Sequence, residues 1–391
     1  MVRMGDVNEA TILHNLRMRF AEDLIHTSIG TILVLLNPFK YFPHLYTKEL
    51  IFEHLNLPPG EVAKPHVYGI AAAAFISLRG ERKNQAIIIS GESGAGKTEA
   101  TKKCLQFFAT ATSSVIEGLQ DRLIQANPIL ESFGNAKTLR NNNSSRFGKW
   151  MEVHFNSRAQ ICGCSIINYL LEKSRIVFQA KNERNYHIFY MLASAAPPEI
   201  RQRLALAGPE AYNYVNKSGC IVVEGLSDHE LYDEIAEAWH ACGFTETETF
   251  NLYNIVAGLL HLSNCNLLVI NEDKAELDKS AGTKLALEKA ASLLGADEAL
   301  LKKTLENKLI EARGERVWSP LNERQAIDAR NSMAKALYSK MFDWLVQRVN
   351  ESMTGAIATS ANIIGVLDIF GFEIFENYSF EQLCINYCNE K

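Results

Sequence analysis

The octapeptide GESGAGKT, from Gly91 to Thr98, constrains the fold and chemistry of this chain more than any other segment. Its pattern, G-x-x-x-x-G-K-[ST], needs glycines because backbone N–H groups must turn toward phosphate oxygens and a Cβ atom would block that approach. Ala86–Ile89 contains three β-branched residues and predicts a buried parallel strand before the loop. Thr98–Phe108 has no Gly or Pro and predicts a helix whose positive N-terminus faces an anion.

This segment therefore predicts a site for nucleotide phosphates. Lys97 would supply a positive charge to the outer phosphates, and Thr98 would offer a hydroxyl to Mg²⁺. A chance match in a glycine-containing loop is the alternative, and the expected strand, loop and helix disfavour it. The residues expected to bind the nucleotide here are Gly91, Glu92, Ser93, Gly94, Ala95, Gly96, Lys97 and Thr98.

The segment NNNSSRFGK, from Asn141 to Lys149, is dense in side-chain hydrogen-bond donors. Amides, hydroxyls and a guanidinium so close together suit a loop that closes over a triphosphate, where donors must meet charge spread over phosphate oxygens. Taken alone, an Asn/Ser cluster followed by Gly also fits a solvated turn.

The segment DIFGFE, from Asp368 to Glu373, follows the apolar run Ile363–Leu367, which predicts a buried strand ending in a carboxylate. An Asp at a strand end can hold Mg²⁺ directly or through a water molecule. Gly371 leaves its backbone N–H free to approach a phosphate closely. The alternative for such an Asp is a helix cap or a turn.

GESGAGKT, NNNSSRFGK and DIFGFE, in this order, resemble the P-loop, switch I and switch II of the myosin motor head. Further stretches resemble the same family: NPFK from Asn37, KPHVYGIA from Lys64, QANPILESFGNAKT from Gln125, YLLEKSR from Tyr169, ERNYHIFY from Glu183 and SFEQLCINYCNEK from Ser379. The resemblance covers essentially the whole chain. It implies an α/β P-loop NTPase fold, with a central mixed, mostly parallel sheet flanked by helices, a largely helical upper subdomain, and a sheet that is incomplete in this chain.

The resemblance also implies roles for single residues. Arg146 matches a switch I arginine that pairs with the switch II glutamate, Glu373, and closes both loops around the γ-phosphate. Gly371 matches the glycine whose N–H senses that phosphate, and the helix starting near Ser379 resembles the relay helix. The implied catalytic residues are Asn141, Ser144, Arg146, Gly371 and Glu373, and the implied Mg²⁺ ligands are Thr98, Ser145 and, through water, Asp368.

One position near the expected adenine departs from a simple match. Asn37 begins the segment that resembles the adenine side of the family's site. The family's usual tyrosine is displaced by one position, because His44, Leu45 and Tyr46 follow Pro43. Adenine contact and aromatic packing are therefore equally open for Tyr46.

Glu311–Arg316 precedes Pro320 without apolar periodicity and predicts an exposed charged loop. In the myosin family the loop at this place touches actin, and an acidic or phosphorylatable residue stands sixteen positions before the residue that Asn331 matches. Counting sixteen positions back from Asn331 gives Glu315. The resemblance therefore implies that this loop carries a permanent negative charge at its actin contact. The alternative is an ordinary run of solvated charged residues. Asn331 stands where the family usually has Asp, which predicts an altered helix cap.

Composition bounds the function without deciding it. The chain has 391 residues, 47% of them hydrophobic and 22% charged, with a net charge of -5. This charge balance does not indicate nucleic-acid binding. The apolar run Ile29–Leu36 is too short to span a bilayer. No secretory signal is visible, so we expect a cytoplasmic protein without direct membrane insertion.

The eight cysteines show no C-x-x-C pair, which predicts reduced cytosolic thiols and no metal site built from protein ligands alone. They are Cys104, Cys162, Cys164, Cys220, Cys242, Cys265, Cys384 and Cys388. The pair Cys162 and Cys164 shares one face of an expected strand, and Cys384 and Cys388 share one face of an expected helix, so we expect core packing for both pairs.

The family resemblance implies an actin-based motor that couples Mg-ATP hydrolysis to filament binding and movement. It divides the chain into a nucleotide-binding core (residues 1–121), switch I with the helical upper subdomain (122–367), and switch II with the start of the relay helix (368–391). Lys391 falls inside that helix, so we expect part of a longer motor, with light chains or calmodulin only on a neck absent here. The alternatives are a nucleotide-binding module without force production and a kinesin-like microtubule motor, which SSRFGK and DIFGFE disfavour.

Overall fold

The chain forms two compact units, each assembled from segments far apart in the sequence. The computed structural model describes residues 8–57, 61, 64–112, 114, 117–312, 315–355, 357–369, 371–374 and 380–390. The first unit comprises Met1–Ala126, Phe147–Leu170 and Arg348–Lys391, and the second comprises Asn127–Arg146 and Leu171–Gln347. The functional division into residues 1–121, 122–367 and 368–391 stays a prediction.

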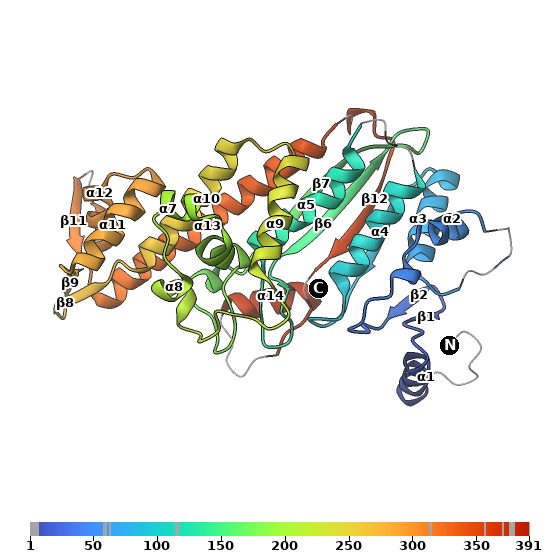
Figure 1. The fold of residues 1–391 in the computed structure, drawn as a ribbon, viewed down its shortest axis with the longest axis horizontal. Coiled ribbons are helices and arrows are strands. Elements are labelled where there is room, and N and C mark those ends of the chain that lie inside the picture. The colour runs from blue at the N-terminus through green and yellow to red at the C-terminus, as the bar shows by residue number, and fades with distance from the viewer. Residues whose placement is uncertain are drawn as a thin grey trace. The chain divides into compact units, whose positions relative to one another are not determined.

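The first unit contains the larger sheet and the helices that pack on it (Figure 1). Its helices are α1 (Glu9–Ala21), α2 (Lys48–Leu55), α3 (Val67–Glu81), α4 (Lys97–Ala111) and α14 (Phe380–Glu390), with short 3-10 turns η1 (Pro43–Leu45) and η5 (Ile357–Thr359). Its strands are β1 (His26–Ile29), β2 (Ile32–Leu35), β3 (Gln85–Ile89), β6 (Gly148–Phe155), β7 (Ile161–Tyr169) and β12 (Asn362–Asp368). Two helices, α5 (Leu119–Gly134) and α13 (Glu323–Met353), contribute residues to both units.

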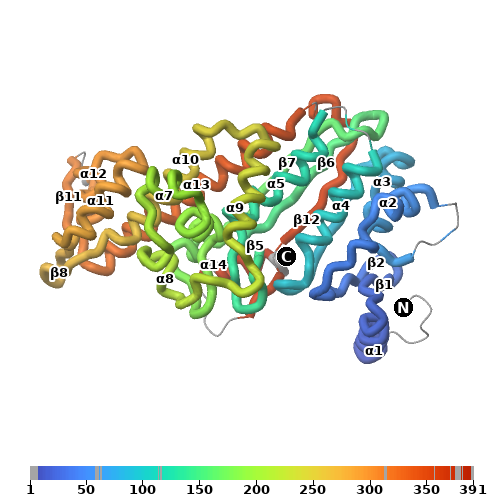
Figure 2. The backbone as a smooth tube through the Cα atoms, in the orientation of Figure 1, coloured from blue at the N-terminus to red at the C-terminus, as the bar shows by residue number. Residues whose placement is uncertain are grey.

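The four-stranded sheet has the order β3-β12-β6-β7. Figure 2 shows β12, from the end of the chain, beside β6 from its middle. The pair β12–β3 is parallel, whereas β12–β6 and β6–β7 are antiparallel. The predicted mixed sheet is confirmed, but among the described strands parallel neighbours do not dominate, because β6 and β7 form an antiparallel hairpin and β6 also runs antiparallel to β12.

The strand β3 is parallel, as predicted, but it is not buried as a whole. Ile87 is buried, whereas Ile88 is 62% exposed. The reason is its place in the sheet: β3 is an edge strand among the described residues, and α3 and α4 pack against it and β12. The predicted helix after the P-loop is confirmed as α4, which buries Thr101, Cys104, Leu105 and Phe108 at helical spacing.

The second unit is mainly helical. Its helices are α6 (His187–Tyr190), the π-helical turn η3 (Met191–Ala195), α7 (Pro198–Arg203), α8 (Asn213–Asn216), α9 (Asp228–Ala241), α10 (Glu246–Ser263), α11 (Ala281–Leu294) and α12 (Glu298–Glu306), with 3-10 turns η2 (Lys173–Ile176) and η4 (Pro209–Ala211). Three two-stranded sheets complete it: β4 (Asn135–Ala136) with β5 (Ser144–Ser145), β8 (Leu267–Asn271) with β9 (Lys274–Leu277), and β10 (Asn307–Ala312) with β11 (Glu315–Pro320).

Two expectations for the second unit are wrong. The charged segment Glu311–Arg316 is exposed at Glu311, Glu315 and Arg316, as predicted, but these residues lie in the strands of a β-hairpin. In this hairpin Glu311 pairs with Arg316 and Ala312 pairs with Glu315. Asn331 lies inside α13 and is not a cap, because its side chain accepts a hydrogen bond of 2.8 Å from the Tyr214 hydroxyl. The hairpin was missed because its strands alternate charged and apolar residues too irregularly to show a period of two.

Only one of the two cysteine pairs is buried as predicted. Cys162 and Cys164 lie buried on β7, as predicted. Cys388 is exposed on α14 and Cys384 is partly exposed, so core packing of this pair is wrong. No disulfide and no group of three metal-ligating side chains occurs among the described residues, and no helix there is long and apolar enough to cross a membrane.

Three buried histidines join β1, α2 and the start of α3 in the first unit. The ring centroids of His26 and His66 lie 4.5 Å apart, and those of His54 and His66 lie 5.2 Å apart. His66 caps α3: its Nδ1 accepts the Tyr68 N–H at 3.0 Å, and its Nε2 donates to the Leu45 carbonyl at 2.8 Å. This arrangement requires neutral His66, because the capping nitrogen must stay unprotonated.

Burial, with smaller effects from His66, His54 and Arg19, lowers the pKa of His26 to about 3. Burial and then His54 lower the pKa of His66 to about 4, although its bond to Leu45 opposes the shift. A folded pKa below the unfolded value of about 6.5 means that the unfolded chain binds more protons below that pH. Stability is therefore lost as the pH falls below 6.5, by up to about 1.4 kcal/mol per pH unit for each such histidine.

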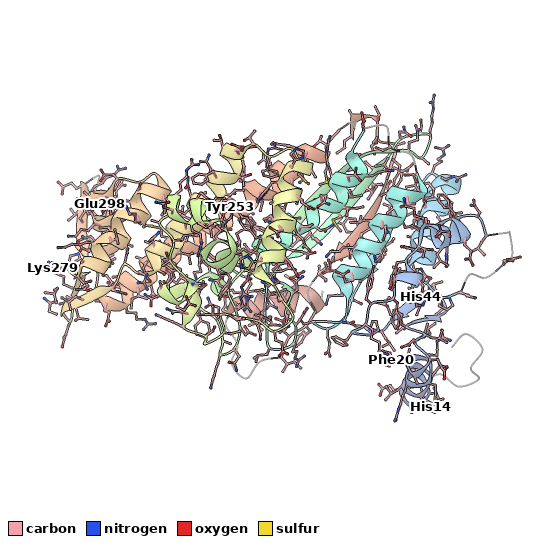
Figure 3. The ribbon with its side chains drawn as sticks, in the orientation of Figure 1. His14, Phe20, His44, Tyr253, Lys279 and Glu298 are labelled. Atoms are coloured by element: carbon pink, nitrogen blue, oxygen red, sulfur yellow. The ribbon has the colours of Figure 1, made fainter. Side chains whose placement is uncertain are left out.

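We expect His26→Phe to make the unfolding midpoint less sensitive to pH between 7 and 5, because it removes one suppressed protonation while keeping an aromatic ring. Thermal unfolding across this range measures the effect. His44→Phe is the control, since His44 is an exposed residue labelled in Figure 3. An unchanged pH slope in His26→Phe would contradict this account of the cluster.

Candidate nucleotide site

The loop Gly91–Gly96 connects the carboxyl end of β3 to the start of α4. Gly96 is the N-cap residue of α4 with φ of 93°, and Gly94 has φ of 80°. Residues other than glycine rarely adopt these positive φ values, so the tight turn of the loop depends on glycine at these two positions. The N–H groups at the start of α4 lie at the positive end of the helix dipole, as a phosphate site requires.

Lys97 already binds the loop's own oxygens. Its Nζ donates hydrogen bonds to the carbonyls of Gly91 at 2.7 Å and Glu92 at 2.9 Å. Burial lowers the pKa of Lys97, while the charges of Asp368, Glu373 and Glu92 oppose that shift. The loop carbonyls therefore hold the ammonium group, and the nearby carboxylates favour its charged form.

Asn37 braces the loop from β2's side. Its Nδ2 donates to the Gly94 carbonyl at 2.7 Å, and its Oδ1 accepts the Phe39 N–H at 3.0 Å. Tyr46 is a packed aromatic: its ring lies 5.6 Å from the His66 ring, and the Lys103 ammonium lies 4.7 Å from its centroid. Whether Tyr46 also contacts adenine stays a prediction.

Asp368 ends β12 beside the last residue of β3, since it stands opposite Ile89 in the parallel register. It is buried, and its Oδ2 lies 3.6 Å from the Nζ of buried Lys149, which stands opposite it on β6. No described residue donates a hydrogen bond to this Oδ2. A buried carboxylate oxygen left in this state is suited to a metal-bound water or a cation.

Switch II approaches the P-loop so closely that Gly371 leaves no room for a side chain. A Cβ atom there would meet the Gly91 carbonyl oxygen and stand 3.1 Å from the Glu92 Cα. Two residues later, the N–H of Glu373 donates to the Asn386 Oδ1 at 3.1 Å, and the Asn386 Nδ2 donates to the Glu373 carbonyl at 2.8 Å. One amide side chain on α14 thus holds the switch II backbone at two points.

The switch I residues from Asn141 to Arg146 belong to the second unit, where Asn143 makes several of their hydrogen bonds. The Asn143 N–H donates to the Asn141 Oδ1 at 3.0 Å, and its own Oδ1 contacts Asn135 Nδ2 at 3.0 Å and His187 Nε2 at 3.1 Å. Ser144 and Ser145 form β5, paired with β4. These bonds brace the loop, while Asn142 and Asn143 are exposed in a turn, so the alternative of a solvated turn stays open.

Arg146 ends this loop and is buried in an ionic cluster. Its Nε donates to the Glu172 Oε2 at 2.7 Å, and its Nη1 donates to the Ser144 Oγ at 3.2 Å. Glu172 also accepts from the Arg175 Nε at 2.6 Å. Burial alone would raise the pKa of Glu172, but Arg146 and Arg175 outweigh it and lower that pKa to about 2.

The comparisons with known proteins decide the family. The family description "Myosin head (motor domain)" matches residues 1–391.

The chain belongs to the myosin head family.

The chain is 47% identical over 398 residues to the high molecular weight form of myosin-1 from Acanthamoeba castellanii, a match that covers 100% of this chain and 25% of the relative. It is 45% identical over 392 residues to unconventional myosin-Ic from Gallus gallus, covering 98% of this chain and 38% of the relative. Myosin-1 from Coccidioides immitis is 44% identical over 396 residues, covering 99% and 31%. The chain thus spans roughly a quarter to two fifths of these relatives, and the match decides against a kinesin-like motor.

Within this myosin head, the first unit brings together Asn37, the P-loop, Asp368, Gly371 and Glu373. The predicted switch I residues lie in the second unit, so the pairing of Arg146 with Glu373 stays a prediction. Sequence reasoning missed four residues at these sites: Glu172, Arg175, Glu183 and Asn386. The signal was present, because all four lie in the motifs YLLEKSR, ERNYHIFY and SFEQLCINYCNEK that carry the resemblance.

We expect Gly371→Ala to loosen the contact between switch II and the P-loop, because the backbone at Gly91 and Glu92 must move away from the added methyl group. Amide hydrogen exchange at residues 91–98 should become faster by roughly 10-fold, which corresponds to about 1.4 kcal/mol of local opening free energy.

Gly282→Ala is the matched control for this change, since nothing lies within 4 Å of a Cβ atom built there. Exchange at residues 91–98 that is equal in the two variants would show that the close approach of Gly371 has no such effect.

Proposed function

We propose that the protein is an actin-based motor that hydrolyses Mg-ATP. One observation carries the nucleotide part of this proposal: Asp368 and the P-loop leave adjacent parallel strands, β12 and β3, at the same edge of the sheet. Ligands of open α/β sheets bind at that edge, beyond the carboxyl ends of the strands. The myosin family match favours ATP as the nucleotide and actin as the partner.

The residues present fit a triphosphate and Mg²⁺. The Gly91–Gly96 loop and the start of α4 offer N–H groups to phosphate oxygens, and the Lys97 ammonium can exchange its loop carbonyls for phosphate. Mg²⁺ would be held by Thr98, Ser145 and, through water, by the unsatisfied carboxylate oxygen of Asp368. The ion supplies charge neutralisation at the phosphates when it is bound.

Catalysis would then depend on positioning and electrostatics. We assign to Asn141 and Ser144 the orientation of the γ-phosphate and the attacking water. Arg146 and Glu373 would form the ion pair that closes the two switches and excludes bulk water. Normal steady-state turnover in an Arg146→Ala protein would exclude this role.

The nucleotide state would reach α14 through switch II. The backbone at Gly371 lies close against Gly91 and Glu92 of the P-loop, and the Glu373 backbone is bonded twice to Asn386 on α14. A phosphate that attracts the Gly371 N–H would therefore pull on the helix that the family resemblance identifies as the relay helix. This coupling supports a motor over a nucleotide-binding module without force production.

The exposed hairpins of the second unit support a protein partner. Leu268, Val269 and Ile270 on β8 are 49%, 50% and 47% exposed, and Val317 on β11 is 58% exposed. Figure 2 shows these hairpins and α12 close together within their unit. Leu268 and Ile270 share one face of β8, and exposed apolar side chains on one face are typical of interaction surfaces. Glu315 adds an exposed negative charge on β11.

We propose a cytoplasmic protein associated with the actin cytoskeleton. Light chains or calmodulin would bind only to a neck region outside residues 1–391. Fluorescence microscopy of the tagged complete protein tests the location, and a distribution unrelated to actin filaments would contradict it.

In the complete protein, Lys97→Ala should weaken ATP binding by at least about 10-fold, because a charge-assisted hydrogen bond to phosphate contributes about 1.5–3 kcal/mol. ATP affinity and steady-state hydrolysis measure the effect. Lys102→Ala is the control on the same helix, since Lys102 pairs with Glu99 at 3.1 Å. Wild-type protein that binds ATP without turnover would identify a nucleotide-binding module instead of a motor.

For the actin contact, we expect Glu315→Ala to lower actin-activated ATP turnover several-fold, because it removes a charge worth roughly 1 kcal/mol at an interface, while basal turnover stays unchanged. Glu298→Ala, at an exposed acidic residue labelled in Figure 3 outside both hairpins, is the control. Equal actin activation in Glu315→Ala and the wild type would remove Glu315 from the actin surface.

A further inference from the structure

The switch I loop is fixed at both ends by one buried network of four charges. At its end, Arg146 bonds to Glu172 at 2.7 Å. At its start, the Leu139 N–H donates to the Glu183 Oε1 at 3.3 Å. Arg175 joins the two carboxylates, with its Nε at 2.6 Å from Glu172 and its Nη1 at 2.9 Å from Glu183.

These groups are withdrawn from water. Arg146, Arg175 and Glu183 have side chains 2%, 3% and 4% exposed, and the Glu172 side chain is 13% exposed. Two carboxylates and two guanidiniums balance to zero, which makes the burial of the network tolerable. Backbone bonds add to the network: the Glu172 N–H donates to the Arg146 carbonyl at 2.9 Å, and the Tyr186 hydroxyl donates to the Glu172 carbonyl at 2.8 Å.

Glu172 differs from Glu183 in one respect that matters for Arg146. Both carboxylates bond to Arg175, but of the two only Glu172 also bonds to the Arg146 guanidinium. The bond uses Arg146 Nε, which leaves the Nη1 to donate to the Ser144 Oγ. Glu172 therefore sets the direction of the guanidinium plane and, through it, the position of the Ser144 hydroxyl.

We propose that Glu172 is a positioning residue for ATP hydrolysis, which acts by holding Arg146 and Ser144 in their working orientation. This inference rests on the proposed function. Glu172 touches neither nucleotide nor water in this role, and Arg175 serves to keep its carboxylate ionised, since that carboxylate faces two guanidiniums.

The test compares Glu172→Gln with Glu183→Gln in the complete protein. Both changes keep the side-chain shape and an accepting oxygen, and both remove one buried charge bonded to Arg175. Both should lower the thermal unfolding midpoint. Only Glu172→Gln should slow single-turnover hydrolysis, by roughly 10-fold or more, while the affinity for ATP changes less than about 3-fold, because misplaced catalytic groups mainly affect the chemical step.

A double-mutant cycle with Arg146→Ala separates positioning from general damage. If Glu172 acts through Arg146, Glu172→Gln should slow hydrolysis by less than about 2-fold in the Arg146→Ala background, because the group that it positions is already gone. A full, independent effect in that background would overturn the proposal. So would wild-type hydrolysis in Glu172→Gln, or equal slowing in Glu183→Gln.

Failure of the proposed function would look different, because the wild type itself would then not hydrolyse ATP.

If Glu172→Gln does not fold, Glu172→Asp replaces it, since aspartate keeps the charge beside Arg175 but withdraws the carboxylate from Arg146. Slower hydrolysis in Glu172→Asp with unchanged ATP affinity supports the proposal, and unchanged hydrolysis overturns it.

Discussion

The parallel pairing of β3 with β12 is the constraint on which the nucleotide site depends. The two strands are separated by most of the chain, yet their register sets Asp368 beside Ile89. The loops that follow both strands consequently start from one sheet edge, and Gly371 can approach the Gly91 carbonyl. The antiparallel neighbour β6 adds Lys149 from the opposite direction, so that a cation lies next to the buried Asp368 carboxylate. A register shift of one residue would turn each of these side chains to the other face of the sheet.

Charged side chains help two loops to hold a shape without regular structure. The P-loop surrounds the Lys97 ammonium, and the switch I loop ends in the Arg146–Glu172 contact. Removing one partner from such a contact is expensive because the other charge stays buried, so each loop is held in a narrow range of positions. His26 and His66, which lie beside Tyr46, are instead buried without charge, because burial lowers the pKa of both, and His66 caps α3.

Much of the first unit could be predicted from the sequence, because its signals are local. Glycine spacing, an apolar strand and a helix without breakers were enough for β3, the P-loop and α4, and the Asp368 strand was found by the same logic. Pairing partners were not accessible in this way. Arg146 bonds to Glu172, and Asn331 bonds to Tyr214, through contacts that only the fold brings together. The hairpin β10–β11 was read as a loop, since its cross-strand hydrogen bonds leave no clear trace in hydrophobic periodicity.

The amide of Asn386 makes switch II and α14 a single mechanical linkage. It donates to one backbone group of Glu373 and accepts from the other, so the bonds fix both the separation and the angle between loop and helix. Any displacement of the Glu373 backbone must either carry the helix along or break two buried hydrogen bonds, each costing about 1–3 kcal/mol. One buried asparagine therefore constrains the switch II backbone and α14 to move together.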